Sequence, residues 1–229
     1  MTNTVDIKEM LEAAVHFGHK TQKWNPRMKN YLYGAQNGVH IFDLYKTKVH
    51  LEKALEFLKQ AAGSGKTILF VSTKPQAAHL IIEAADATKM PYVINKWMGG
   101  LLTNFSTIKQ RIRYLKTLKE QEKTGEFQKY TKKEASQLRK VIVKLETALG
   151  GVRDLDRLPD AVFVADVVRD KIVVTEARKL KIPVIAITDS NADPNGIAYP
   201  IPGNDDALKS LTYLIHKVES AILSGKGAR

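Results

Sequence analysis

Imidazole and carboxylate groups are the side chains of this sequence that could form a reactive or metal-binding site. His19 lies in a segment, residues 16–29, that contains no acidic residue, whereas Asp189 and Asp205 follow stretches in which we predict β-strands. One imidazole and two carboxylates could bind zinc or magnesium if the fold brought them together. Carboxylates after strands are also common as helix caps and turn residues. The sequence therefore leaves a metal site and a purely structural role both open.

The sequence contains no complete motif of a catalytic site. The chain has no cysteine, which excludes thiol nucleophiles and cysteine-bound zinc. Gly65-Lys66-Thr67 resembles the end of a nucleotide-binding phosphate loop, but Gln60 stands where that motif needs its first glycine, and the segment precedes a predicted strand instead of following one. Gly99-Gly100 could let a phosphate approach the backbone, or could form an ordinary turn. These motifs do not predict an enzyme.

Positive charge gives the strongest functional signal. The chain has 36 Lys and Arg residues against 24 Asp and Glu, a net charge of +12, and residues 107–146 alone contain 12 basic and 5 acidic residues. More than half of the excess therefore lies in one short region. A solvated helix surface usually mixes both signs for i,i+4 pairing, so this imbalance favours binding to a polyanion. The candidate contacts are Lys109, Arg111, Arg113, Lys116, Lys132, Lys133, Arg139 and Lys140.

A second basic region lies near the N-terminus, in a segment that we predict to be a loop. Its basic residues are Lys20, Lys23, Arg27 and Lys29, and its aromatic residues are Phe17, Trp24, Tyr31 and Tyr33. Basic side chains contact phosphates and aromatic rings stack on bases, a combination that suits irregular RNA better than duplex DNA. Core packing is the alternative role for the aromatic rings.

A third candidate site of contact with RNA consists of Lys96, Trp97 and Asn104. They follow a predicted strand, at the carboxyl edge of the sheet, where open α/β sheets bind their ligands. Trp97 could anchor this turn in the core, or it could stack on a base. The first role predicts a large effect of its removal on folding, and the second predicts an effect on binding.

The apolar stretch Ile68–Val71 organises the predicted fold. It is short and rich in β-forming residues, which is typical of a buried parallel strand. Thr73 is predicted to cap the helix that begins at Pro75. Further strands are expected at residues 92–94, 161–165 and 184–187, with a less secure edge strand near residues 197–201. Strands that alternate with helices predict an α/β fold with a doubly wound parallel sheet.

Apolar residues three and four positions apart predict two helices between the second and third of these strands. They are Phe105, Ile108, Ile112 and Leu115 in the first helix, and Ala135, Leu138, Ile142, Leu145 and Leu149 in the second. Thr131 and Glu134 predict a capping box. We expect an inserted, basic, antiparallel helical hairpin of coiled-coil type at residues 105–150, between the first part of the α/β domain (1–104) and its second part (151–229).

Targeting signals are not evident in the sequence. There is no run of 18 apolar residues, and the N-terminus lacks the basic and apolar regions of a signal peptide. We therefore expect a cytoplasmic protein that does not act at a membrane.

Three blocks of the sequence closely resemble the ribosomal protein S2 family of the small subunit. The first runs from Met10 through His16-Phe17-Gly18-His19 to Pro26, and the second from Pro91 through Trp97-Met98-Gly99-Gly100 to Phe105. The third contains Leu158-Pro159-Asp160-Ala161, Glu176-Ala177-Arg178-Lys179-Leu180 and Pro200-Ile201-Pro202-Gly203-Asn204-Asp205-Asp206. The resemblance covers essentially the whole chain. It implies a flavodoxin-like sheet with a helical hairpin of the bacterial and organellar type.

The resemblance also implies a function. It predicts a structural constituent of the small ribosomal subunit that binds small-subunit ribosomal RNA, takes part in translation, lies near protein S1 and other ribosomal proteins, and needs no cofactor or small-molecule substrate. The alternative is a doubly wound nucleotide-binding protein or enzyme that uses the carboxyl edge of its sheet. An enzyme needs a compact acid–base set in a pocket, whereas this chain spreads basic residues over a loop and a hairpin, which favours the ribosomal role.

Overall fold

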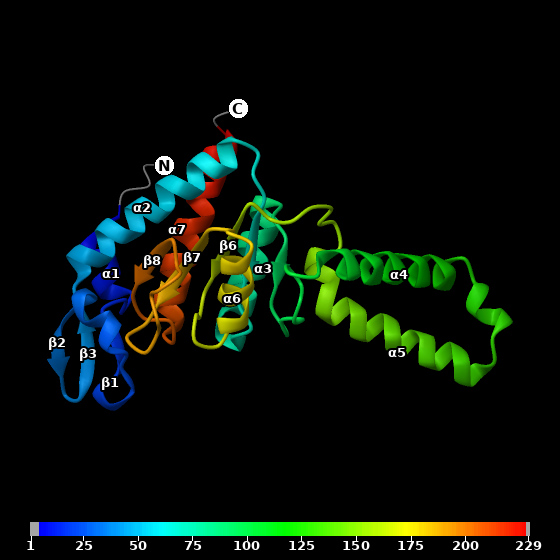
Figure 1. The fold of residues 1–229 in the computed structure, drawn as a ribbon, viewed down its shortest axis with the longest axis horizontal. Coiled ribbons are helices and arrows are strands. Elements are labelled where there is room, and N and C mark those ends of the chain that lie inside the picture. Colours follow the sequence, from blue (N-terminus) through cyan, green and yellow to red (C-terminus); the bar gives the residue numbers. More distant parts are fainter. Residues whose placement is uncertain (1–4, 228–229) are drawn as a thin grey trace.

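A five-stranded parallel sheet forms the centre of the protein. The structure is a computed structural model that describes residues 5–227 (Figure 1). In spatial order the strands are β5 (Tyr92–Val93), β4 (Ile68–Val71), β6 (Ala161–Val164), β7 (Val184–Thr188) and β8 (Tyr199–Pro202). Numbered along the chain, this is the order 2-1-3-4-5 of flavodoxin-like proteins. The predicted α/β fold class is confirmed, and β8 lies at an edge, where its prolines are tolerated.

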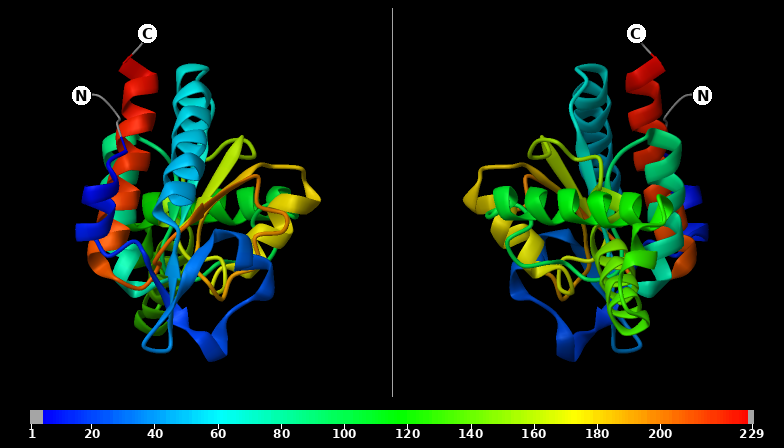
Figure 2. Two further views of the ribbon diagram at one scale, coloured as in Figure 1. Left: turned by 90° about the vertical axis from the view of Figure 1, so that its left-hand side faces the viewer. Right: turned by 90° about the vertical axis from the view of Figure 1, so that its right-hand side faces the viewer.

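Helices cover both faces of this sheet (Figure 2). One face carries α1 (Ile7–Glu12), α2 (Leu44–Gly63), α3 (Pro75–Thr88) and α7 (Leu208–Gly227). The other carries α6 (Lys171–Lys179) and the near ends of α4 (Phe105–Lys123) and α5 (Lys132–Leu149). Ile68 and Phe70 face the first set, while Leu69 and Val71 face the second, and all four are fully buried. Burial on both faces explains why this strand is apolar at every position.

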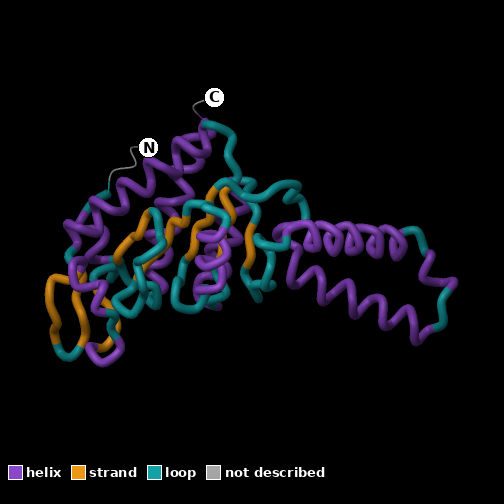
Figure 3. Tube along the Cα trace, viewed as in Figure 1, coloured by secondary structure: helices purple, strands orange, loops and turns teal. Residues whose placement is uncertain are grey.

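Helices α4 and α5 lie side by side and extend away from the sheet (Figures 1 and 3). A short 3-10 helix, Glu126–Lys129, follows α4. The predicted capping box is confirmed, because Thr131 Oγ1 accepts the Glu134 N–H (3.3 Å) and the Glu134 carboxylate accepts the Thr131 N–H (3.0 Å). The far part of the pair has its own core of Leu115, Leu118, Phe127, Ala135 and Ile142. In residues 5–227, no helix combines the length and the hydropathy needed to cross a bilayer.

A small antiparallel sheet lies at the opposite end of the protein. Its order is β1 (Phe17–Lys20), β3 (Val39–Phe42) and β2 (Leu32–Gln36). The prediction of a loop for residues 16–29 is wrong at Phe17–Lys20, because Phe17 pairs with Ile41, which lies further along the chain. Two 3-10 helices, Thr21–Lys23 and Pro26–Tyr31, complete the segment.

The predicted cap of α3 is also wrong. Lys74, and not Thr73, precedes the helix, and no side chain caps it. Thr73 instead donates its N–H (3.0 Å) and its hydroxyl (2.8 Å) to the carboxylate of Asp170, which follows β6. A carboxylate accepts stronger hydrogen bonds from the Thr73 N–H and hydroxyl than a neutral acceptor would.

Candidate nucleic-acid interface

Exposed basic side chains cover the α4–α5 pair, whose apolar seam faces inward. We name five of them the arm cluster: Arg111, Arg113, Lys132, Lys133 and Lys140. Each is exposed, and within the described residues none of the five forms an ion pair. Guanidinium and ammonium groups without carboxylate partners are available to bind phosphate oxygens.

The other predicted arm contacts bind acceptors within the chain. Lys109 donates to the Asp156 carbonyl (2.7 Å), Lys116 pairs with Asp154 (3.2 Å), and Arg139 pairs with Glu122 (2.9 Å). The two exposed ion pairs, those of Lys116 and Arg139, contribute only about 0–1 kcal/mol each. A phosphate can therefore replace the carboxylate at little cost in stability.

The N-terminal basic segment is fixed to the carboxyl edge of the large sheet. Ser190, which follows β7, accepts the Asn25 N–H at its carbonyl (2.7 Å) and the His19 N–H at its hydroxyl (2.8 Å). A Cβ at Gly18 would lie 2.8 Å from the Ser190 hydroxyl, so this approach requires glycine. Lys20, Lys23 and Lys29 are exposed and form no ion pair in the described part of the chain. The backbone of the segment is therefore held in place, while its three unpaired lysine side chains are available to bind a phosphate.

Arg27 and Trp24 of the same segment have partners within the protein. The Arg27 guanidinium pairs with the carboxylate of Asp193 in an exposed contact. The half-buried indole of Trp24 lies against His40, with ring centroids 5.0 Å apart. Both side chains therefore help to hold the segment in place.

Trp97 is a core side chain. It is 7% exposed and packs with Leu101 and Leu102 in the second core cluster, so its ring is not available to stack on a base. Its Nε1–H donates to the carboxylate of Glu176 on α6 (3.0 Å). Of the two roles that the sequence left open, the structure supports the structural one, and we correct the prediction that Trp97 contacts RNA. Lys96 and Asn104 on the same loop are exposed.

Glu176 holds this loop together from its centre. Its carboxylate also accepts the N–H groups of Gly100 (2.8 Å), Leu102 (3.0 Å) and Thr103 (3.1 Å). Burial by itself would raise the pKa of Glu176, but these hydrogen bonds to its charged form outweigh that effect and lower the pKa below its ordinary value. Sequence reasoning missed this role, because Glu176 lies more than seventy positions from the loop.

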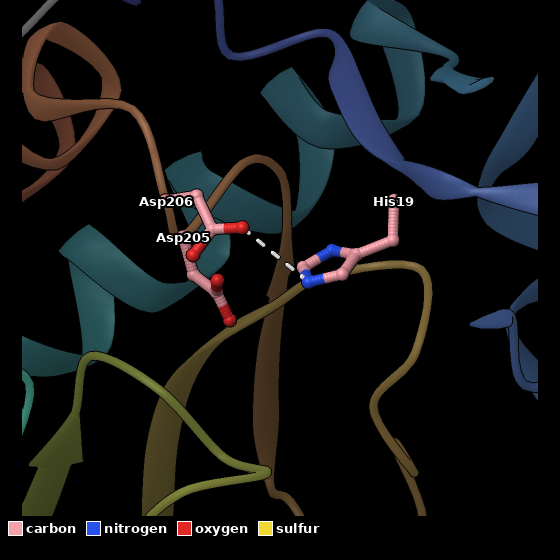
Figure 4. Close-up of side chains that lie close together, drawn as sticks. All are labelled: His19, Asp205 and Asp206. Atoms are coloured by element: carbon pink, nitrogen blue, oxygen red, sulfur yellow. Dashed lines mark ion pairs between the residues drawn. The ribbon is translucent and has the colours of Figure 1, made fainter.

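A cluster of charged groups lies at the carboxyl ends of β4, β6, β7 and β8. Figure 4 draws its members His19, Asp205 and Asp206. We name it the edge cluster: His19, Lys74, Asp166, Asp189, Asp205 and Asp206. The Lys74 ammonium lies 2.8 Å from Asp205, 2.6 Å from Asp206 and 3.3 Å from Asp166. His19 Nδ1 lies 3.0 Å from Asp189, and its Nε2 lies 3.4 Å from Asp206. The four carboxylates thus find their positive partners inside the protein.

The pKa values of the cluster follow from this geometry. The hydrogen bond with Asp189 raises the pKa of His19 above its ordinary value. Burial, together with repulsion from Asp189 and Asp166, raises the pKa of Asp205 to about 7, although Lys74 opposes the rise. Burial would lower the pKa of Lys74, but the surrounding carboxylates raise it well above its ordinary value. Lys74 is therefore charged at all physiological pH values.

The predicted metal ligands His19, Asp189 and Asp205 do not form a suitable site. Both oxygens of Asp189 are occupied, since Oδ1 faces His19 and the Ser190 N–H while Oδ2 accepts the Asp205 N–H (3.2 Å). The ligand atoms that do converge belong to His19, Asp205 and Asp206. Lys74 already lies within 2.8 Å of both of these carboxylates and supplies their positive charge. A divalent ion would have to displace a buried ammonium, so the donor set does not fit a metal.

We expect zinc and magnesium to leave the melting temperature of chelator-stripped protein unchanged, both at about pH 7.5 and at about pH 5.5. The reason is that the Lys74 ammonium already lies between the carboxylates of Asp205 and Asp206, where a metal ion would have to bind. Differential scanning calorimetry with and without EDTA measures this directly. A metal-dependent rise that disappears in Asp206→Asn would contradict the expectation.

The crevice that other doubly wound proteins use for ligands is filled by this protein's own side chains. In such folds it lies between the carboxyl ends of the strands at which the strand order reverses, here β4 and β6. Lys74 and Asp166 come from these two strand ends and pair with each other (3.3 Å), while Asp170 is bonded to Thr73. The fold and this site define a class of α/β protein with two features. Basic side chains without ion-pair partners in residues 5–227 lie on its surface, and the carboxylates in its crevice are neutralised by a lysine of the same chain.

Comparison with known proteins identifies the family. The model of the family "Ribosomal protein S2" matches residues 10–225. The small ribosomal subunit protein uS2 of Dictyoglomus thermophilum is 49% identical over 223 residues, which is 97% of this chain and 91% of that protein. Proteins of the same name from Mycobacteroides abscessus and Nitratiruptor sp. are 47% and 49% identical over 225 residues, 98% of this chain and 81% and 84% of theirs. This chain belongs to the ribosomal protein S2 family.

Family membership confirms the resemblance seen in the sequence. It makes the chain a ribosomal protein and not an enzyme, so the alternative of a doubly wound enzyme is not favoured. The filled crevice is consistent with this result, because the usual ligand position of the fold has become part of the internal packing.

Proposed function

We propose that this protein is a structural constituent of the small ribosomal subunit that binds small-subunit ribosomal RNA and takes part in translation. The observation that carries the proposal is the arm cluster, whose five basic side chains are exposed and, within the described residues, without ion pairs. Phosphate neutralisation by such groups is the main source of affinity for nucleic acids. The names of the relatives, which are small-subunit proteins, support the same role.

The proposed interface extends beyond the arm cluster. It includes Lys109, Lys116 and Arg139 on α4 and α5, Lys20, Lys23, Trp24, Arg27 and Lys29 in the N-terminal segment, and Lys96 and Asn104 beside the arm. We propose that residues 105–150 form an inserted coiled-coil arm between the two parts of the α/β domain, 1–104 and 151–229. The separate core of the α4–α5 pair supports this division.

The proposed surroundings follow from the ribosomal role. We infer that the protein acts in the cytoplasm, on the ribosome, next to other small-subunit proteins. Protein S1 is proposed as one of them from the family resemblance alone. Neither a cofactor nor a small-molecule substrate is required for this role.

Reversing Arg111, Arg113 and Lys140 to Glu is expected to weaken binding to small-subunit ribosomal RNA without unfolding the protein, because all three lie off the apolar seam. The slope of log affinity against log salt should fall by roughly 0.7–0.9 for each phosphate that the variant no longer neutralises. Fluorescence anisotropy at several KCl concentrations measures both quantities, and thermal melting checks the fold.

The matched control reverses Lys53, Lys59 and Lys179, three exposed lysines outside the proposed interface, and so changes the net charge equally. The arm variant should lose much more affinity than the control. Equal affinities and equal salt slopes in the two variants would remove the arm from the interface and leave only a general effect of net charge.

A further inference from the structure

Strand β2 and the strand-facing end of α2 lie at the end of the protein opposite the α4–α5 pair (Figure 1), and each carries a strongly exposed tyrosine. Tyr33 on β2 is 83% exposed and Tyr45 in the first turn of α2 is 73% exposed, the two highest values among the large apolar side chains of residues 5–227. The Asp43 N–H donates to the Tyr31 carbonyl (3.0 Å), which holds the start of α2 beside the start of β2. The backbone segments that carry the two rings therefore lie beside each other.

The other aromatic rings of the N-terminal region already have ring partners. Phe17 lies against His16 (centroids 4.1 Å apart), Trp24 against His40 (5.0 Å), and Tyr31 against His50 (5.1 Å). Tyr33 and Tyr45 form no such contact within the described residues. Among the N-terminal aromatic rings that the sequence suggested for base stacking, Tyr33 is therefore the one without a ring partner in the described residues, and Tyr45 on α2 has none there either.

The charges on the segments that carry these two rings are suited to a polyanion. Lys29, which precedes β2, is exposed and forms no ion pair in the described part of the chain. The one acidic group between β3 and α2 is Asp43, and its carboxylate accepts the N–H groups of Tyr45 (3.1 Å) and Lys46 (3.4 Å). Its negative charge is therefore directed at the helix N-terminus, where it is stabilised.

We propose that Tyr33 and Tyr45, together with Lys29 of the proposed interface, form an RNA-binding surface that takes unpaired nucleotides; we name these three residues the tyrosine patch. The inference rests on the proposed function and deepens it, because it assigns a class of RNA structure to one end of the protein. In a duplex the faces of the bases are stacked on each other, whereas an unpaired base can stack on an exposed ring. Lys29 supplies the contact to the phosphate.

The test compares a short unstructured RNA with a duplex of equal length, using the full chain. In Tyr33→Ala/Tyr45→Ala, affinity for the unstructured RNA should fall about 5- to 150-fold for each ring that stacks, and affinity for the duplex should not change. The matched control, Tyr33→Phe/Tyr45→Phe, keeps both rings and should bind like the unchanged protein. Because both side chains are exposed, all variants should melt at the same temperature.

Two results would overturn the inference. One is an equal effect, or no effect, on the two RNAs. The other is unchanged RNA affinity together with poor incorporation of the alanine variant into small subunits, which would assign the rings to a protein partner. The charge-reversed arm variant separates this inference from the proposed function. If that variant loses affinity and the alanine variant does not, only the tyrosine patch is wrong; if the unchanged protein shows no salt-dependent RNA binding, the proposed function fails as well.

Discussion

The variant Trp97→Ala is expected to lose about 3–5 kcal/mol of its free energy of unfolding. The indole is 7% exposed and packs with Leu101 and Leu102, so its removal leaves a cavity in the second core cluster. It also removes one of the donors to the Glu176 carboxylate. Chemical denaturation gives the change in stability. RNA binding by the protein that remains folded should be nearly unchanged, because the ring is buried.

Glu176→Gln provides the matched control for the polar part of this contact. The amide has nearly the shape of the carboxylate but brings an NH₂ group against backbone N–H groups of Gly100 or Leu102. We expect a loss of about 1–3 kcal/mol. A loss of less than about 1 kcal/mol in Trp97→Ala, or a specific loss of RNA affinity by folded Trp97→Ala, would contradict the core role of the tryptophan.

The contribution of Glu176 should depend on pH in a defined direction. Hydrogen bonding lowers its pKa below the ordinary value of 4.5, so the unfolded protein binds the proton more tightly than the folded one. The stability that Glu176 supplies is therefore complete above the unfolded pKa and declines as the pH falls through the folded pKa. The difference between Glu176 and its Gln variant should shrink below a pH of about 4.5.

Replacing Lys74 by methionine is expected to cost about 3–5 kcal/mol, the usual effect of removing one member of a buried ion pair. Methionine fills the space of the aliphatic chain but leaves Asp205 and Asp166 without their cation. The exposed Asp206 should matter less, because water can solvate it. Denaturant melts at about pH 8 and about pH 5 measure the effect.

The loss in Lys74→Met should be smaller at the lower pH. A carboxyl group with a raised pKa binds its proton more tightly in the folded protein, so stability falls as the pH rises from the unfolded value toward the folded one. For Asp205 this window extends from 3.8 to about 7 even with Lys74 present. In the Lys74→Met variant, protonation of Asp205 at about pH 5 should relieve its repulsion with Asp189 and Asp166.

The double variant Lys74→Met/Asp205→Asn tests whether the pair acts as one unit. Removing the aspartate charge together with its partner should cost less than the two single changes added together. Additive losses, or a loss in Lys74→Met that does not depend on pH, would show that the ammonium stabilises the protein by packing and not by charge.

The elements that are predictable from sequence are those formed by local interactions. The apolar run Ile68–Val71 predicts the buried strand that the structure contains, and the capping box of Thr131 and Glu134 joins residues three positions apart. Such features depend on neighbouring side chains and on backbone preferences, which are visible in a short window. Family resemblance added the flavodoxin-like architecture, which local patterns do not contain.

Contacts between distant residues were decided only by the tertiary structure. The N-terminal segment, predicted to be a loop, contains β1, because its partner strand lies elsewhere in the chain. Thr73 is a donor to Asp170 and not a helix cap, and Trp97 is a core residue because Glu176 and the second core cluster surround it. Each outcome depends on a contact between segments that are far apart in the sequence, which no short window contains.

The edge cluster was predicted only in part from the sequence. The sequence predicts that His19, Asp189 and Asp205 lie near one another, and they do, but the prediction omits Lys74. This lysine lies shortly after β4, so the rule that placed the aspartates at the carboxyl edge would also have placed the lysine there. Composition and spacing determined that this protein is a basic α/β protein. Packing decided that its buried carboxylates are neutralised by an internal ammonium, because the Lys74 Nζ lies 3.3 Å from Asp166 and 2.8 Å from Asp205, and a buried carboxylate without a partner is costly.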